Sequence, residues 1–267
     1  MMEKLTSILA VVTEGGAKGA MFDKVCRIAR HSGARVELFL AAPSDHSASV
    51  ARCASLGCEA DLGFTLHDSV TPMAEAILER ADELHADLLI APRGQLHLDA
   101  CPIPLLLIGK TPWAPVPRFA AAIDVAEHDS EIVGRSILHV AGFMVQRLAA
   151  HLDVLYSERE LIDESVKFER AVRLARLVRE YYVGCERLQV FDGLPEDTLP
   201  PLISARHYDV LVVGSVARHR ALLSALHSIS KKLLASTEGD VLVVNPAPER
   251  PAAPMMRSAG QQLAHQA

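Results

Sequence analysis

The residues best suited to chemistry cluster directly after an apolar run that ends at residue 213. Gly214 and Ser215 lead into a short basic group at 218–220, which contains Arg218, and Ser228 lies in the helical pattern that follows. A glycine permits a tight turn, and arginine N–H groups and helix N-termini bind anions. The pattern therefore fits an anion or phosphate site, and a solvated basic loop is the alternative interpretation.

A carboxylate marks a second loop, where Asp124 ends the apolar run that begins at Arg118. At the end of a parallel strand a carboxylate can accept hydrogen bonds from a ribose or a base. It can equally shape a local turn. Asp129 or Ser130 is better explained as the cap of the next helix.

A third loop, at 14–19, holds three glycines and Lys18 after the first apolar run. It has neither the G-x-G-x-x-G spacing of dinucleotide sites nor the spacing of a Walker A loop. A glycine cluster of this kind most simply forms a turn.

Support for catalysis or for a metal site is thin. The sequence has no G-x-S-x-G elbow, no H-E-x-x-H and no paired-cysteine zinc spacing. Histidines do lie near Cys53, Cys58 and Cys101, but at irregular intervals, so surface histidines and buried thiols explain them better. We expect no catalytic residue and no bound metal.

Composition excludes other classes of partner. The 27 basic and 33 acidic residues give a net charge of −6, which disfavours binding to nucleic acid or to an anionic membrane. The apolar runs are too short to span a bilayer. Five scattered cysteines without a C-x-x-C pair suit reduced thiols, so we expect a cytoplasmic protein.

The elements that must position these residues occur twice along the chain. Short apolar runs that read as buried strands alternate with amphipathic helical patterns, which is typical of parallel strands covered on both faces. One helical face carries apolar residues at three- and four-residue steps. The strand-like runs are 6–12, 36–40, 60–66, 85–91 and 104–108 in the first half, and 118–124, 152–156, 187–191, 207–213 and 240–244 in the second; the helical face is Val133, Ile137, Val140, Met144 and Leu148.

The two copies differ in completeness. About 25 residues with a helical pattern separate the last two strands of the second half, whereas only the short segment 93–101 separates them in the first. We therefore expect repeat 1 over residues 1–112 without most of its last helix, a proline-rich linker over 113–117, repeat 2 over 118–246, and a disordered tail over 247–267.

These features together resemble the universal stress proteins. The resemblance rests on the two α/β repeats, on Asp124 at the end of a first strand, and on the Gly214-Ser215-x-x-Arg218 loop that feeds a helix with Ser228. The linker and the shortened first repeat are similar to tandem members of this UspA superfamily, of the UspE type. The resemblance implies two tandem open five-stranded parallel sheets with helices on both faces, a fold shared with the adenine nucleotide alpha hydrolases. It also implies pseudo-twofold pairing of the repeats.

Nucleotide-binding members of that family carry Gly-x2-Gly-x9-Gly-Ser/Thr in this loop. The pattern keeps Gly214 and Ser228 here, but Ala217 and His227 replace the other two glycines, and Thr13 replaces the family's Asp in repeat 1. A Cβ atom and an imidazole ring hinder the backbone approach that phosphate binding needs.

The leading hypothesis is thus a non-catalytic binding or signalling module of the stress response, with no cofactor. One alternative is an ATP-binding protein with slow hydrolysis or autophosphorylation, in which Asp124 holds the adenosine and Gly214, Ser215, Arg218 and Ser228 hold phosphates with Mg²⁺. Another is an apolar or metabolite pocket in the open repeat 1, near Ala41, Leu66 and Ala91. A homodimer stays open as a further assembly.

Overall fold

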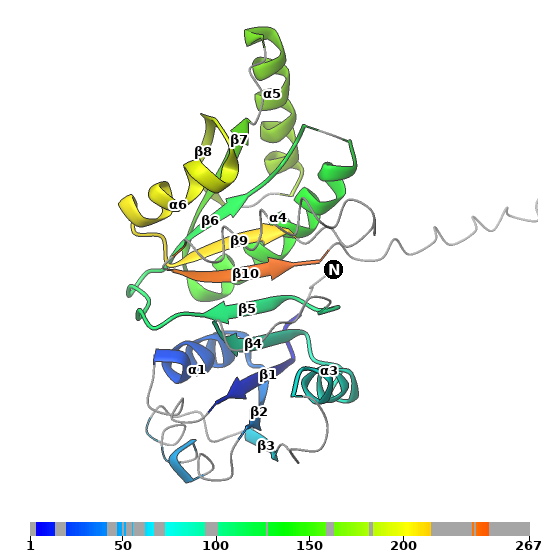
Figure 1. Ribbon diagram of the computed structural model, residues 1–267, viewed down its shortest axis with the longest axis vertical. Helices are drawn as coiled ribbons and strands as arrows, with labels where there is room; N and C mark the ends of the chain where they lie inside the picture. The colour runs from blue at the N-terminus through cyan, green and yellow to red at the C-terminus, as the bar shows by residue number, and fades with distance from the viewer. Residues whose placement is uncertain are drawn as a thin grey trace, which may run out of the picture.

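One continuous sheet organises the computed structural model, in the strand order β3-β2-β1-β4-β5-β10-β9-β6-β7-β8. Figure 1 shows it from β3 at the bottom to β8 near the top. The structure describes residues 4–13, 20–41, 47–49, 51, 55, 62–66, 73–93, 101–126, 128–158, 163–181, 184–214, 237 and 239–245.

Each half of the chain supplies five strands, and within a half every pairing is parallel. The spatial order is the same in both halves, with the first strand between the second and the fourth. The first half consists of β1 (Ser7–Val12), α1 (Ala20–Ser32), β2 (Arg35–Leu40), β3 (Leu62–Leu66), α3 (Met73–Glu83), β4 (Leu88–Pro92) and β5 (Leu105–Ile108). The second consists of β6 (Arg118–Ala122), α4 (His128–Leu148), β7 (His151–Glu158), α5 (Glu164–Glu180), β8 (Cys185–Asp192), α6 (Pro195–Ala205), β9 (Val210–Gly214) and β10 (Asp240–Val244). The predicted α/β fold class is confirmed.

The halves meet through their last strands. β5 pairs antiparallel with β10, with Leu106 opposite Leu242. This pairing joins the two five-stranded sets edge to edge, so the last strand of each half is covered by the other half instead of being an exposed sheet edge.

Helices cover both faces of the sheet, and alternating strand residues feed two sides of the core. In β1, Ile8 packs in the cluster that contains α1 and α4, whereas Leu9 packs in the cluster beneath α3. α6 covers the corresponding face of the second half. The helical face predicted for α4 is confirmed, since Ile137, Val140, Met144 and Leu148 are buried and Val133 packs against them.

A repeated tripeptide, His-x-Asp, has a structural role in both halves. His85 and His207 adopt left-handed backbone conformations, with φ of 47° and 53°, which end α3 and α6. Two residues later, Asp87 accepts hydrogen bonds from the backbone N–H of Thr6 at 2.7 Å, and Asp209 accepts one from Arg118 N–H at 2.8 Å. Each aspartate thus fixes the start of the first strand of its own half.

Several sequence-based predictions lie outside the described residues. They include the glycine loop at 14–19, the short segment 93–101 in which the last helix of repeat 1 is predicted to be missing, of which 94–100 are not described, the helical pattern after residue 214, and the tail from 247. The division into repeats, linker and tail stays a prediction.

Candidate functional site

Two of the predicted site residues, Asp124 and Gly214, lie at the carboxyl ends of neighbouring strands. β6 and β9 pair in parallel with Ala121 opposite Val212, so the residues that follow them emerge at the same edge of the sheet. Ligands of open α/β sheets bind at this edge. Ser215, Arg218 and Ser228 lie outside the described residues, so the structure brings together only this pair.

Asp124 forms a local turn. Its side chain is exposed, and Oδ1 accepts a hydrogen bond from the backbone N–H of Ala126 at 2.9 Å. This is the geometry of an Asx turn, in which a short carboxylate stabilises the chain two residues on. Both predicted roles of Asp124, in ligand contact and in the turn, remain compatible with its exposure.

Gly214 allows α4 to approach the sheet. A Cβ atom at this position would lie 2.1 Å from Cγ1 of Val133 and 3.2 Å from Cδ1 of Ile137. A side chain at this position requires the Val133 side chain or α4 to move. Close packing of α4 on the end of β9 is therefore sufficient to explain the glycine, without a ligand.

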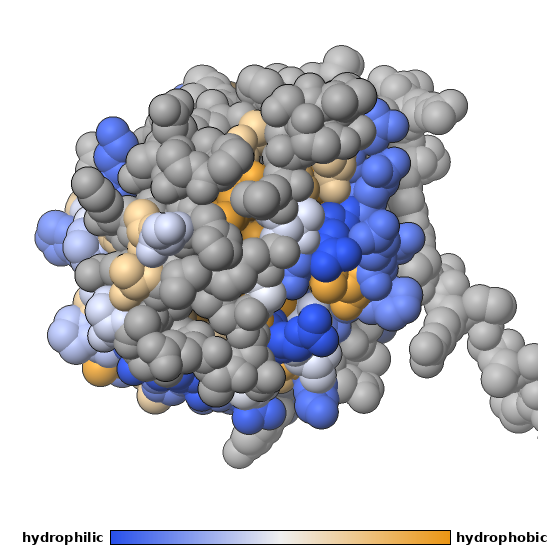
Figure 2. All heavy atoms as spheres, turned by 90° about the horizontal axis from the view of Figure 1, so that it is seen from below, coloured by the Kyte–Doolittle hydropathy of each residue, from blue (hydrophilic) through white to orange (hydrophobic). Residues whose placement is uncertain are grey.

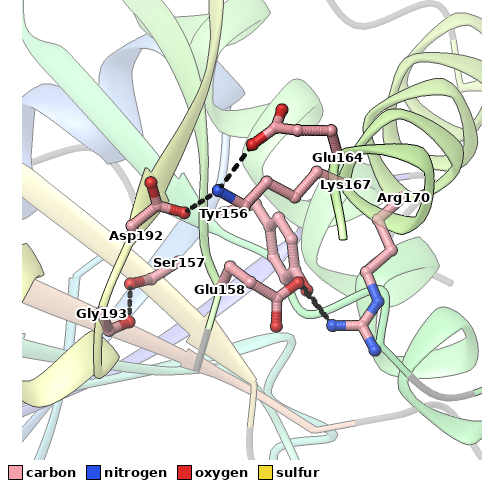
Figure 3. A network of polar contacts seen from close by, with 8 residues as sticks. All are labelled: Tyr156, Ser157, Glu158, Glu164, Lys167, Arg170, Asp192 and Gly193. Atoms are coloured by element: carbon pink, nitrogen blue, oxygen red, sulfur yellow. Dashed lines mark hydrogen bonds and ion pairs between the residues drawn. The ribbon is translucent and has the colours of Figure 1, made fainter. Parts of the chain in front are cut away.

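A buried polar cluster, which the sequence analysis did not predict, lies where β7 ends. Glu158 is only 2% exposed and accepts hydrogen bonds from the Tyr156 hydroxyl, at 2.6 Å, and from Arg170 of α5. Figure 3 shows Arg170 reaching from the helix to the carboxylate. Burial, and then the hydrogen bond to Glu158, raises the pKa of Tyr156. The hydrogen bond to Glu158 raises the pKa of Arg170, so the guanidinium remains charged.

Other polar groups at this edge are also held by the chain itself. Arg173 donates to the carbonyl oxygen of Val125 at 3.1 Å, just past Asp124. Lys167 forms an ion pair with Asp192 at the end of β8, at 3.1 Å (Figure 3). α5 is thereby fixed across the ends of β6, β7 and β8. The sequence marked only one side of this contact, because Asp192 directly follows the apolar run 187–191 but nothing identified its partner on α5.

The described residues offer little for metal or thiol chemistry. Among them, no group of three or more His, Cys, Asp or Glu side chains is arranged to hold a metal ion. Cys101 is buried, and burial raises its thiol pKa, which lowers its nucleophilicity at neutral pH. Cys53 and Cys58 lie outside the described residues.

The expected pocket of repeat 1 is only partly described. Ala91 is fully buried in the core cluster beneath α3, so its side chain does not line an open cavity. Ala41 is half-buried, and nothing is described of the Leu66 side chain.

Solved structures define the class of fold. A protein of Pseudomonas aeruginosa UCBPP-PA14, described as a universal stress protein, is similar over 91% of this chain and 94% of its own length, with a TM-score of 0.75 and 19% identity. A universal stress protein of Archaeoglobus fulgidus DSM 4304 is similar over 91% of this chain and 97% of its own, with a TM-score of 0.61 and 11% identity. The fold is that of the universal stress proteins.

Sequence relatives point to one type within that class. Universal stress protein E of Escherichia coli K12 is 20% identical over 198 residues, which cover 67% of this chain and 61% of the relative. The Salmonella typhi protein of the same name matches to the same extent. The chain matches no protein-family model. The resemblance to universal stress proteins of the E type is confirmed, although the match spans less than two thirds of those relatives' length.

No helix among the described residues has the length and apolar character needed to cross a membrane.

Proposed function

We propose that the protein is a cytoplasmic, non-catalytic binding or signalling module of the stress response, built as a tandem universal stress protein with intramolecular pseudo-twofold pairing of its repeats. The observation that carries the proposal is that charged side chains at the carboxyl ends of the second-half strands are paired within the chain. There, the polar side chains that end β7 and β8 are partnered by α5 instead of facing an open crevice. The β5–β10 pairing supports the pseudo-twofold arrangement.

The electrostatics of this edge support binding without catalysis. A catalytic acid, base or nucleophile has a perturbed pKa and access to substrate. Glu158 is buried and paired with Arg170, and the Tyr156 hydroxyl donates its hydrogen bond to Glu158, so access to a substrate is missing. These groups stabilise the position of α5 and have no proton free for a substrate.

A thermal-shift titration with Mg-ATP, and with AMP as a second probe, tests the proposal. We expect no rise in Tm, because a ligand present at a hundred times its Kd must stabilise the native state by about 2.7 kcal/mol. A saturable rise accompanied by steady release of phosphate contradicts the non-catalytic function.

ATP binding with slow hydrolysis or autophosphorylation is the second candidate, and one observation favours it. Asp124 is exposed at the carboxyl end of β6, beside the end of β9 from which the Gly214-Ser215 loop departs. In this alternative, Asp124 contacts the adenosine, while Arg218 and Ser228 contact the phosphates and Mg²⁺.

The variant that separates the two candidates must leave the fold intact. Substitution of Gly214 is unsuitable, because a Cβ there meets Val133 and changes the stability without any ligand. Asp124→Asn retains an acceptor for Ala126 N–H and removes only the charge. A Tm rise with Mg-ATP that Asp124→Asn and Arg218→Ala both weaken supports the second candidate, and an unchanged Tm in all three proteins supports the first.

A further inference from the structure

The outward face of α5 is the described surface that most needs a partner. Among the described residues, exposed large apolar side chains are few, and two of them, Phe168 at 72% and Val172 at 50%, lie one turn apart on this helix. Figure 1 shows α5 at the top of the molecule beside β7 and β8, with its upper end extending beyond these strands. Figure 2 views the opposite end, beneath β3, where the described apolar patches are small and separated by hydrophilic side chains.

α5 carries apolar side chains on two opposite faces. Leu174 and Leu177 face the core. The opposite face is one stripe whose members follow each other at three- and four-residue steps and therefore lie in a line along the helix. All of its members are exposed: Glu164, Phe168, Val172, Ala175 and Arg179.

A cleft of about 720 Å³ adjoins this stripe, between α5 and α4. It is lined by Arg135 of α4 and by Val172, Ala175, Arg176, Arg179 and Glu180 of α5. Arg135 and Glu180 are 4.0 Å apart. Among the described residues, Arg176 and Arg179 have no carboxylate partner. The cleft thus offers apolar contact beside two arginines that can each bind a carboxylate.

Exposed charges of α5 can form pairs with those of an antiparallel copy of the same helix. Glu164 and Arg179 lie at nearly equal distances along the helix on either side of Val172, and so do Glu169 and Arg176. Glu164 and Glu169 are 89% and 69% exposed, and their described ion pairs, with Lys167 and Arg173, are within the helix. An antiparallel copy of α5 related by a twofold axis at Val172 therefore sets Glu164 near Arg179 and Glu169 near Arg176 of the other chain, while Glu180 keeps its ion pair with Arg135 of its own chain.

We propose that the occupant of this surface is a second copy of the chain, joined through an antiparallel α5–α5 contact. A twofold interface uses the same patch on both copies, so each favourable contact occurs twice. Phe168 packs beside Val172 and Ala175 of the partner at the centre, and the Glu164–Arg179 pairs close both ends. Helix pairing of this kind buries apolar area through residues spaced three and four apart.

The contact is small, so the dimer is weak and reversible. One helix per chain buries less than the roughly 1,200–2,000 Å² of a stable interface. Charge pairs on its rim are screened by salt. We expect a concentration-dependent dimer that dissociates as ionic strength rises.

Sedimentation velocity of the full chain over a concentration series tests the surface. Val172→Glu places two carboxylates at the twofold axis, and Phe168→Asp removes the largest apolar contact. Each change is expected to weaken the dimer at least about tenfold. Val116→Glu is the matched control, because Val116 is 46% exposed and lies in the segment between β5 and β6, away from α5. Its dimer is expected to be unchanged.

Charge reversal tests the antiparallel geometry. Glu164→Arg and Arg179→Glu each place like charges opposite one another in their own homodimer, so each is expected to be monomeric. An equimolar mixture of the two variants restores both opposite-charge pairs and is expected to dimerise. Circular dichroism verifies that each variant keeps its fold.

Three results overturn the proposal. They are a wild-type chain that is monomeric throughout the series, a dimer that withstands Val172→Glu and Phe168→Asp, and a mixture of the charge-reversed variants that associates no more than either variant alone.

Discussion

Lys24 of α1 and Asp240 of β10 form an ion pair that links the two halves of the chain. The Nζ–Oδ2 distance is 2.8 Å, and both side chains are only 2% exposed. Asp240 also accepts hydrogen bonds from the backbone N–H of Gly109 and from Nε1 of Trp113, each at 2.7 Å. One carboxylate therefore holds a helix of the first half, the end of β5 and the segment that leads to β6.

Lys24→Met is expected to destabilise the protein strongly. The substitution keeps an apolar stem of similar length but leaves Asp240 buried without its cation, and breaking a buried pair in this way costs about 3–5 kcal/mol. Urea unfolding measures the free energy. Glu83→Gln is the control, because its ion pair with Arg80 is also 2.8 Å long but lies on the surface, where such pairs contribute about 0.2–1 kcal/mol. Equal losses of stability in the two variants would show that the buried Lys24–Asp240 pair contributes no more than an ion pair on the surface.

The stability that depends on Asp240 is expected to fall as pH rises through the weakly acidic range. Burial raises the pKa of Asp240 above its ordinary 3.8, against the opposing effect of Lys24. The folded state then binds the proton more tightly than the unfolded state, so the contribution is greatest below 3.8 and declines until pH exceeds the raised value. In Asp240→Asn this decline is expected to disappear. Urea unfolding from about pH 4 to pH 7 measures it, and the emission of Trp113, the single tryptophan, follows the same titration. Identical pH profiles for the two proteins contradict the prediction.

The sequence predicted what depends on local pattern. The apolar runs identified the strands, and the spacing of Ile137, Val140 and Met144 identified the buried face of α4, because periodicity reports burial directly. The same patterns could not predict contacts between segments that are distant in the sequence. Lys24 and Asp240 are separated by 216 positions, and neither residue type signals that the other is its partner. The prolines identified the linker at 113–117, but nothing in the sequence predicted the hydrogen bond from Trp113 to Asp240 that secures it.

The candidate site divides in the same way. The sequence identified Asp124 and Gly214 because both end strands, and the parallel β6–β9 pairing brings them to one edge. It could not tell a glycine needed by a phosphate from one needed by a helix, because that difference depends on the distance to Val133. The cluster around Glu158 was missed because its partner Arg170 lies on a helix whose orientation the sequence does not specify.

Arg170→Met is expected to cost more stability than Arg173→Met. The first change leaves Glu158 buried without a cation, for a loss of about 3–5 kcal/mol. The second removes one hydrogen bond to the Val125 carbonyl and an ion pair with the exposed Glu169, for a loss of about 1 kcal/mol. Urea unfolding of the two variants gives the comparison. A loss for Arg170→Met as small as that for Arg173→Met would mean that water reaches Glu158 and replaces the arginine.

Gly214→Ala tests whether this glycine is required by α4 or by a ligand. The added Cβ would lie 2.1 Å from Cγ1 of Val133, and overpacking of this kind costs about 1–3 kcal/mol without any ligand present. Val133→Ala removes the obstructing methyl group. Adding Gly214→Ala to the Val133→Ala variant is therefore expected to cost much less stability than adding Gly214→Ala to the wild-type protein. A double-mutant cycle from urea unfolding measures the coupling between the two positions. A coupling close to zero would show that α4 shifts freely to admit the methyl group, and the role of Gly214 would then have to be sought in the loop that follows it.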